Sequence, residues 1–395
     1  MSEFPDSGNN FVPIGDVASI SRGTINPSQN PLEIFNYYSI PGYDSTGGPS
    51  RTPGKEIQSN KTILEGKCVL ISKLNPRIPR VCIANTTGDA KTICSTEFIP
   101  LVPRNQGIDL DYIAHYLRSP SFQEKFQAAA GGSTNSHSRV TPNEILDWEI
   151  FVPPLPEQKK IAEILSGIDK RKELLKKQRE KLQVAYKALS GELLGSLPSK
   201  VPLGDICDLQ VGFPFRSADF SDEGVRLLRG ENVGYGVPNW ERAQFLPNSL
   251  AEASSMYQVS AGDIVIGMDR SFTKSGFKVS KISSADLPCL LVQRVGRFAP
   301  KSISTNFLWH ILQSPDYQRV LLSSEKGMDI PHLSKGEVLE PLVPVADTPT
   351  QERISNSLDS MLKSIHTIDV SIAATSQLGA ALQSDLLSGR KRVSV

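Results

Sequence analysis

Cysteine is scarce in this sequence, and nothing in its spacing ties the few cysteines together. Cys68, Cys82, Cys94, Cys207 and Cys289 are odd in number, and no two of them form a CxxC pair. Disulfide frameworks and zinc sites both need paired or closely spaced thiols, so neither is indicated. We therefore expect reduced, buried thiols and no metal site in this chain.

Long apolar runs and a secretion signal are missing as well. No stretch of about 18 apolar residues occurs, and the opening MSEFPDSGNNF has neither a positive start nor an apolar core. We therefore expect no membrane span and a cytoplasmic location. The formal net charge is only +1, which argues against a protein that binds a polyanion through bulk charge. Any contact with a nucleic acid must then be local or shared with a partner.

Known catalytic motifs are also lacking. The nearest match to a phosphate-binding loop, Gly48–Lys55, has five residues between its glycines in place of four, and Glu56 stands where a hydroxyl residue should bind magnesium. No GxGxxG follows a strand, no HExxH, GxSxG or EF-hand loop occurs, and the five histidines are scattered. A chain this long without a reaction centre indicates recognition or scaffolding, and we expect no catalytic residues.

Two stretches carry a heptad repeat of apolar residues instead. The first runs from Pro156 to Gly195, and the second begins at Thr348, displaced by about 193 residues so that Gln158 matches Gln351. At about 1.5 Å per residue, each forms a helical rod of roughly 60 Å. A rod with one apolar seam needs a partner helix, and the basic first rod suits the slightly acidic second. The predicted seam consists of Ile161, Ile168, Leu175, Leu182, Leu189, Ile354, Met361, Ile368 and Leu382.

The second rod has distinctive features at both ends. Thr348–Gln351 has the pattern of a capping box. Thr375 and Gly379 weaken the seam near the C-terminal end, so we expect looser packing there. The last residues, Arg390–Val395, predict a frayed basic tail.

Motifs outside the rods recur at the same spacing, which indicates one duplicated unit. Val12–Asp16 matches Val201–Asp205, and a helix pattern that ends at Pro120 recurs before Pro315. We predict an α+β fold in which two mixed α/β domains are separated by two long antiparallel coiled-coil helices and related by a pseudo-twofold repeat. The predicted divisions are 1–152, 153–196, 197–345 and 346–395. The predicted strands are Cys68–Ser72, Val81–Ala84, Phe98–Val102, Ile264–Ile266 and Leu290–Val295.

The chain resembles the specificity (S) subunit of type I restriction–modification systems. Three stretches carry the resemblance besides Val12–Asp16: Pro153–Ala162, Gly262–Asp269 and the terminal Asp385–Val393. The second copy departs from the family pattern, because Asp347-Thr-Pro-Thr-Gln351 replaces the usual Pro-Leu-Pro-Glu-Gln. The resemblance covers nearly the whole chain.

The resemblance implies two target-recognition domains, each recognising one half of a split site in double-stranded DNA. It implies that the long helices set the spacer and dock two methyltransferase (M) subunits. S-adenosylmethionine for adenine methylation would then bind to those partners. ATP and Mg would serve the restriction (R) subunits of the full complex. No cofactor is expected on this chain itself.

Five loops are the best candidates for contact with DNA. Arginine suits guanine, and asparagine or glutamine suits adenine. Loops 73–80 and 131–139 of the first domain match loops 268–278 and 325–332 of the second in position but not in sequence, and Arg229–Asn232 is a fifth candidate. The candidate DNA-contacting residues are Lys73, Asn75, Arg77, Arg80, Ser133, Asn135, His137, Arg139, Arg229, Asn232, Arg270, Lys274, Lys278, Lys326 and His332.

Two other interpretations remain open at the level of the sequence. The chain could serve a fused restriction–methyltransferase enzyme, or lend its domains to another complex as an orphan specificity subunit. It could also be a coiled-coil scaffold that joins two binding heads and has no role on DNA. Duplex binding in the presence of methyltransferase subunits would separate the scaffold from the other two.

Overall fold

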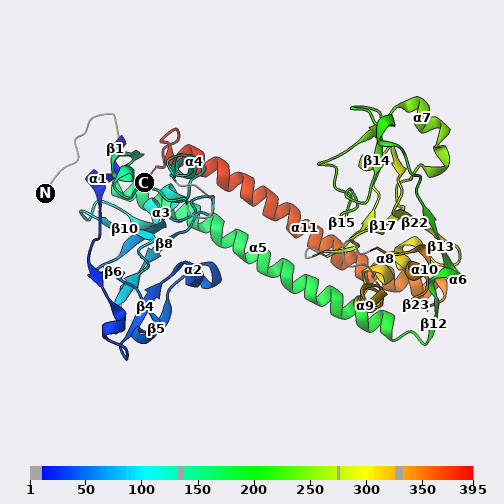
Figure 1. The fold of residues 1–395 in the computed structure, drawn as a ribbon, viewed down its shortest axis with the longest axis horizontal. Coiled ribbons are helices and arrows are strands. Elements are labelled where there is room, and N and C mark those ends of the chain that lie inside the picture. Colours follow the sequence, from blue (N-terminus) through cyan, green and yellow to red (C-terminus); the bar gives the residue numbers. More distant parts are fainter. Residues whose placement is uncertain (1–10, 87, 132–137, 274–275, 325–331, 395) are drawn as a thin grey trace. The chain divides into compact units, whose positions relative to one another are not determined.

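The computed structural model describes residues 11–394 except for residue 87 and the segments 132–137, 274–275 and 325–331. The chain divides into two compact units, and unit 1 is made from two separate parts of the sequence. Unit 1 comprises Met1–Lys176 and Val370–Val395, whereas unit 2 comprises Lys177–Asp369. Two long helices, α5 (Leu155–Gly195) and α11 (Thr348–Leu387), each contribute to both units (Figure 1).

Unit 1 is built on antiparallel and mixed sheets around the buried strand β7. Every residue of β7 is buried because the strand lies between two neighbours and under helix α3. The first sheet has the order β2 (Ala18–Ile20), β10 (Phe98–Pro103), β7 (Cys68–Ser72), β8 (Val81–Ala84). The second has the order β3 (Thr24–Ile25), β6 (Lys61–Leu64), β9 (Thr92–Cys94), β4 (Ile34–Tyr38), β5 (Ser50–Pro53), and β1 (Phe11–Pro13) pairs with β11 (Glu149–Phe151).

The shorter helices of unit 1 have clear start signals. Asp109 caps α3 by accepting from the backbone N–H of Tyr112, and Ser119 caps the next helix in the same way, just before Pro120. A proline is tolerated there because the first helical N–H has no partner in any case. These helices are α1 (Ile14–Val17), α2 (Ile40–Thr46), α3 (Leu110–Arg118) and α4 (Pro120–Ala128).

Unit 2 repeats this plan, but its main sheet has five strands where the first sheet of unit 1 has four. The main sheet has the order β13 (Cys207–Val211), β22 (Val295–Pro300), β17 (Ile264–Gly267), β20 (Val279–Lys281), β15 (Tyr235–Gly236). Smaller sheets join β16 (Phe245–Leu246), β14 (Val225–Leu228) and β21 (Cys289–Leu291), pair β12 (Ser199–Pro202) with β23 (Leu342–Val345), and pair β18 (Phe272–Thr273) with β19 (Gly276–Phe277). The helices are α6 (Leu203–Ile206), α7 (Asn248–Ala253), α8 (Thr305–Gln313), α9 (Pro315–Ser324) and α10 (Lys335–Leu339).

The two long helices pack on each other within each unit. In unit 1, Ile161 near the start of α5 shares one apolar cluster with Leu386 near the end of α11. In unit 2, Leu189 near the end of α5 packs on the cluster that contains Ile354 near the start of α11. The helices therefore run antiparallel, and all nine predicted seam residues are buried or half-buried. The predicted α+β fold with two related halves and long helices is confirmed.

Three local predictions were wrong. Leu290–Val295 is not one strand, because β21 ends at Leu291 and β22 begins only at Val295 after a turn. The second long helix is capped by Asp347, whose carboxylate accepts from the N–H of Thr350, so the expected capping box at Thr348 does not form.

The C-terminal residues before Val395 are also not frayed. The Arg392 guanidinium makes two hydrogen bonds, of 2.8 and 2.7 Å, to the buried Glu157 carboxylate at the start of α5. The Val393 N–H donates to the same carboxylate at 3.1 Å. A basic segment that would be solvated on its own is thus held by a carboxylate distant in sequence.

Two expectations about composition can be compared with the described residues. All five cysteines are free and buried, as expected, and burial raises the pKa of the Cys68 thiol to about 12. Within the described residues, no helix combines the length and apolar character needed to cross a bilayer.

Candidate nucleic-acid interface

In unit 1, the structure joins the two predicted loops by backbone pairing. The loop after β7 bridges the second loop through Leu74 and Arg139, and the N–H of Asn75 donates to the carbonyl of Ser138 at 3.0 Å. The N–H of Val140 donates to the carbonyl of Lys73 at 3.2 Å. Residues far apart in the sequence therefore form one surface at the end of a buried strand.

Unit 2 uses the same arrangement after the matching strand β17. Asp269 bridges His332, and the N–H of Leu333 donates to the carbonyl of Met268 at 2.8 Å. The bridge pairs Leu74 with Arg139 in unit 1 and Asp269 with His332 in unit 2. The scaffold of the two surfaces is equivalent, whereas their side chains are different.

Backbone strain is concentrated at these surfaces. In the described chain, three non-glycine residues have positive φ: Asn75 at 48°, Arg270 at 45° and Arg294 at 66°. Residues other than glycine seldom adopt this region, and such outliers gather at functional sites. Asn75 follows β7 by three residues, and Arg270 follows β17 by three residues. Both loops therefore turn sharply at the same point.

The arginines of unit 1 have different roles. Arg77 is exposed and has no hydrogen-bond or ion-pair partner among the described residues. Arg139 binds both carboxylate oxygens of Glu97, at 3.0 and 3.2 Å. Lys73 is half-buried beside them. Among the arginines predicted in these two loops, Arg77 is therefore the one whose guanidinium is available to a ligand.

Arg80 does not have the role expected from the sequence. Its side chain is 7% exposed, and its guanidinium binds both oxygens of Asp44 in α2, at 2.6 and 2.9 Å. This bidentate hydrogen bonding lowers the pKa of the Asp44 carboxyl. Arg80 holds the loop against the domain and is not available to a base edge.

Three of the predicted unit 2 residues line one cavity of about 540 Å³. Arg229, Arg270 and Lys278 come from three separate segments of the chain. Arg294 also lines this cavity, although the sequence analysis did not predict it as a site residue. The polar pair Gln293–Arg294 interrupts an apolar run, and that interruption could have signalled the turn that places Arg294 here.

Two acidic residues partly balance this basic cavity. Arg229 is 2.6 Å from a Glu231 carboxylate oxygen, and Arg294 donates to Asp269 at 2.8 Å. Arg270 is exposed and has no such partner in the described part of the chain. Burial lowers the pKa of the Lys278 ammonium group, since a low-dielectric environment disfavours its charge. The net positive cavity suits an anionic ligand such as a phosphodiester chain.

The remaining predicted residues divide into two groups. Asn232 is buried, accepts from the N–H of Arg229 at 3.3 Å and donates to the carbonyl of Asn239 at 3.0 Å, so it braces the loop and does not face a ligand. His332 is exposed at the bridge. Five predicted residues lie outside the described residues: Ser133, Asn135, His137, Lys274 and Lys326.

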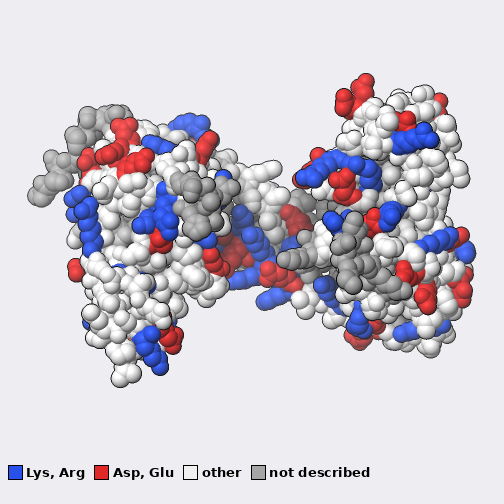
Figure 2. Space-filling view, in the orientation of Figure 1, with Lys and Arg blue, Asp and Glu red and all other residues white. Residues whose placement is uncertain are grey.

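On the face drawn in Figure 2, basic side chains do not gather into one large patch. In Figure 2, lysine and arginine side chains are interspersed with aspartate and glutamate on both units. In the part of the chain that the structure describes, no three His, Cys, Asp or Glu side chains gather as a metal site.

Comparisons with known proteins point to one family. A family model described as the type I restriction modification DNA specificity domain matches residues 6–184 and again 199–373. The specificity subunit of the type I restriction enzyme MjaVIII from Methanocaldococcus jannaschii is 29% identical over 291 residues, covering 69% of this chain and 68% of the relative. The EcoAI specificity subunit from Escherichia coli is 31% identical over 237 residues, covering 58% of this chain and 40% of the relative.

Solved structures share the fold. A chain from a structure on complex assembly and conformational transition of the type I R-M system has a TM-score of 0.62 at 18% identity, covering 98% of this chain and 99% of that one. The type I restriction-modification S subunit from M. genitalium has a TM-score of 0.58 at 16% identity, covering 97% and 98%. These similarities concern the fold.

Proposed function

This chain belongs to the family of type I restriction modification DNA specificity domains, and we propose that it is the DNA-recognition subunit of a type I restriction–modification enzyme. Each of its two mixed α/β domains, residues 1–152 and 197–345, recognises one half of a bipartite site in double-stranded DNA.

One observation carries this proposal: both units place a strained, arginine-bearing loop at the same point of an equivalent scaffold. The loops follow β7 and β17, bridge a second loop, and present Arg77 and Arg270 without protein partners among the described residues. An exposed arginine can make a bidentate contact to guanine in the major groove. Equal scaffolds with unlike side chains are expected of two domains that recognise different half-sites.

The long helices, residues 153–196 and 346–395, set the spacing of the half-sites and dock methyltransferase subunits. Helix α5 has 41 residues, which at about 1.5 Å per residue gives roughly 60 Å. One turn of B-DNA is about 34–36 Å, so the helix is long enough to separate two half-sites. We assign two M subunits, one for each repeat, and R subunits in the full complex.

Catalysis belongs to the partners in this proposal. The M subunits bind S-adenosylmethionine and methylate adenine, and the R subunits use ATP and Mg. The near-neutral net charge of this chain means that partners supply much of the phosphate contact and hence much of the salt dependence. The assembly works in the cytoplasm.

Mapping of methylated adenine tests the proposal. The chain is co-expressed with its M subunits in a host without adenine methylation, and methylated positions are mapped across the genome. We expect a single motif with two defined halves and an undefined spacer. M subunits expressed alone are the control and should give no such motif. A continuous motif, or identical methylation with and without this chain, would contradict the proposal.

A further inference from the structure

A buried histidine in unit 2 has both ring nitrogens occupied. His310 of α8 has no exposed surface. Its Nε2 lies 3.1 Å from an Asp359 oxygen, and its Nδ1 lies 3.0 Å from the Tyr186 hydroxyl. A carboxylate accepts a hydrogen bond from Nε2–H, so in the neutral ring Nδ1 accepts the hydrogen bond that the tyrosine donates.

The matching histidine in unit 1 has a hydrogen-bond partner at only one of its two ring nitrogens. His115 of α3 is also buried, and its Nε2 lies 2.9 Å from the Ser166 hydroxyl, at the position that matches Asp359. The nearest acidic oxygen to Nδ1 belongs to Asp169 and is 3.9 Å away, beyond hydrogen-bond range. The shift of 193 residues that matches Gln158 with Gln351 places Gly379 where unit 2 has Tyr186.

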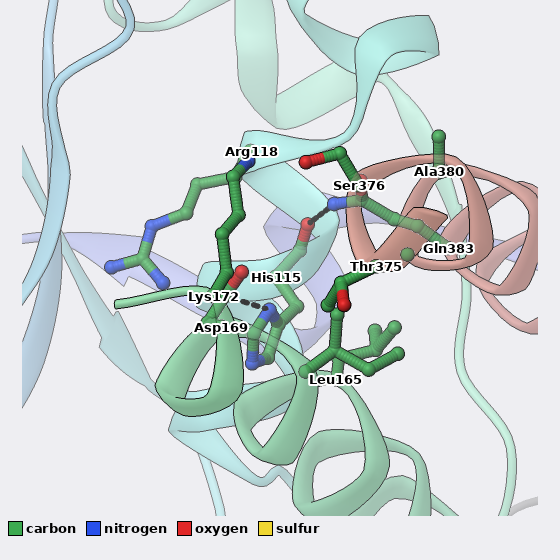
Figure 3. Close-up of a pocket in the computed structure, with 11 residues that line it drawn as sticks. His115, Arg118, Leu165, Asp169, Lys172, Thr375, Ser376, Ala380 and Gln383 are labelled. Atoms are coloured by element: carbon green, nitrogen blue, oxygen red, sulfur yellow. Dashed lines mark hydrogen bonds and ion pairs between the residues drawn. The ribbon is translucent and has the colours of Figure 1, made fainter. Parts of the chain in front are cut away.

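A cavity is present in unit 1 beside Gly379, the residue that matches Tyr186 of unit 2. It has a volume of about 280 Å³ and lies between α3, α5 and α11, with His115 and Thr375 in its wall (Figure 3). Gly379 lines it as well. Thr375 matches Leu182 of unit 2. Thr375 and Gly379 in unit 1 therefore correspond to the larger Leu182 and Tyr186 in unit 2. Looser packing at Thr375 and Gly379 stays a prediction, because both residues line the cavity but Gly379 also lies close to Ile168.

We propose that this cavity is a binding site for a phenol ring, whose hydroxyl donates to Nδ1 of His115. The ring takes the place of the Tyr186 side chain, against the apolar groups of Leu165 and Ile168. Asp169 and Lys172 also line the cavity. The inference depends on the duplication and is independent of what the loops recognise.

The chemistry of the cavity supports an aromatic ligand with one polar atom. Burial lowers the pKa of His115, which favours the neutral ring. In the tautomer that donates its Nε2–H to the Ser166 hydroxyl, Nδ1 is free to accept from a ligand hydroxyl. Ligand sites in proteins start at about 300 Å³, so a cavity of this volume fits one ring and not a large cofactor. Thr375 does not compete for the ligand hydroxyl, because its own hydroxyl donates to the carbonyl of Ser371 at 2.7 Å.

Binding of 4-fluorophenol to the full-length chain, followed by ¹⁹F NMR, tests this site. We expect saturable binding to the wild type and binding at least tenfold weaker to Gly379→Tyr, which fills the cavity. A Cβ at Gly379 would lie 3.0 Å from the Ile168 methyl group, so the single variant could strain the helix pair. Gly379→Tyr with Ile168→Met avoids this, because it recreates the pair of Tyr186 and Met361 found in unit 2.

Two controls make the result specific. Tyr186→Gly opens the matching space in unit 2 and should add a second binding site. 4-Fluorotoluene lacks the hydroxyl and should bind at least fivefold more weakly than 4-fluorophenol. Absence of binding to the wild type when Tyr186→Gly does bind would overturn the proposal. Undiminished binding to both filled variants would also overturn it, because the ligand would then lie elsewhere.

The ¹⁹F signal of bound 4-fluorophenol also tests what occupies the cavity naturally. Methyltransferase subunits are added to the chain already loaded with 4-fluorophenol. Release of the ligand is the result expected if a partner's tyrosine side chain occupies the cavity in the complex. Retention means that the cavity serves a free phenolic molecule. Both results support the site and differ only in its natural occupant.

Discussion

Gln158 in unit 1 and Gln351 in unit 2 make the same contacts from different helices. Gln158 accepts from the N–H of Asp109 at the start of α3, and Gln351 accepts from the N–H of Ser304 at the start of α8, both at 2.9 Å. Each also donates to a carbonyl just before its own helix. The duplication has kept these buried contacts, whereas the loops after β7 and β17 have diverged. Buried hydrogen bonds are costly to lose, but an exposed loop can change its side chains freely.

The largest expected effect comes from breaking α5, one of the two long helices that contribute to both units. Leu175→Pro in the interior of α5 removes a backbone hydrogen bond and clashes with the preceding turn, at a cost of about 3 kcal/mol or more. Unfolding by denaturant should show this loss, and the methylated motif should lose its fixed spacer. Leu174→Ala at the neighbouring exposed position is the control. An unchanged spacer in the proline variant would count against α5 as the element that sets it.

The next effect sharpens the comparison of the loops. Arg77→Ala and Arg270→Ala should each weaken binding to the specific duplex by about 1–3 kcal/mol if the guanidinium is bidentate to a base. Binding of the assembled methyltransferase to specific and random duplexes measures this by fluorescence anisotropy. Equal losses on both duplexes would indicate phosphate contacts instead.

The matched glutamines test whether the two frameworks are energetically equivalent. Gln158→Ala and Gln351→Ala each leave buried backbone groups unpaired, so each should lower the free energy of unfolding by about 1–3 kcal/mol. Both glutamines are buried, at 1% and 6% exposure. Similar costs in the two variants are expected from chemical denaturation. A large cost in one and none in the other would show that the repeats no longer share this support.

A smaller effect concerns the contact between Arg392 and Glu157 in unit 1. Arg392→Ala removes the partner of the Glu157 carboxylate, and the cost should be about 1 kcal/mol because the arginine is 52% exposed and partly screened by solvent. Arg392 lowers the pKa of Glu157. The contribution is therefore present above the ordinary glutamate pKa and is lost as the pH falls through the lowered value.

Thermal unfolding of the wild type and Arg392→Ala at several pH values measures this contribution. The difference between the two proteins should be full near neutral pH and shrink in acid. A difference that grows as the pH falls would contradict the assigned ion pair.

Patterns along the sequence were sufficient for the elements that local periodicity determines. The heptad seam, the buried run of β7 and the helix starts at proline follow from spacing alone. The contacts that sequence missed join distant residues: Arg80 with Asp44 of α2, and Arg392 with Glu157. Whether an arginine faces solvent or a carboxylate depends on such pairings, which no local pattern encodes. The predicted loops lie together as expected. Single residues within them, such as Arg80, are not all available to a ligand, because their partners are distant in sequence.

The two units should recognise different halves of one DNA site. Adenine methylation should be mapped across the genome for the wild type, Arg77→Ala and Arg270→Ala, each expressed with its M subunits. We predict that each variant relaxes one half of the bipartite motif, a different half in each case, while the other half and the spacer stay unchanged. Relaxation of the same half by both variants, or of both halves by either one, would contradict the division of recognition between the units.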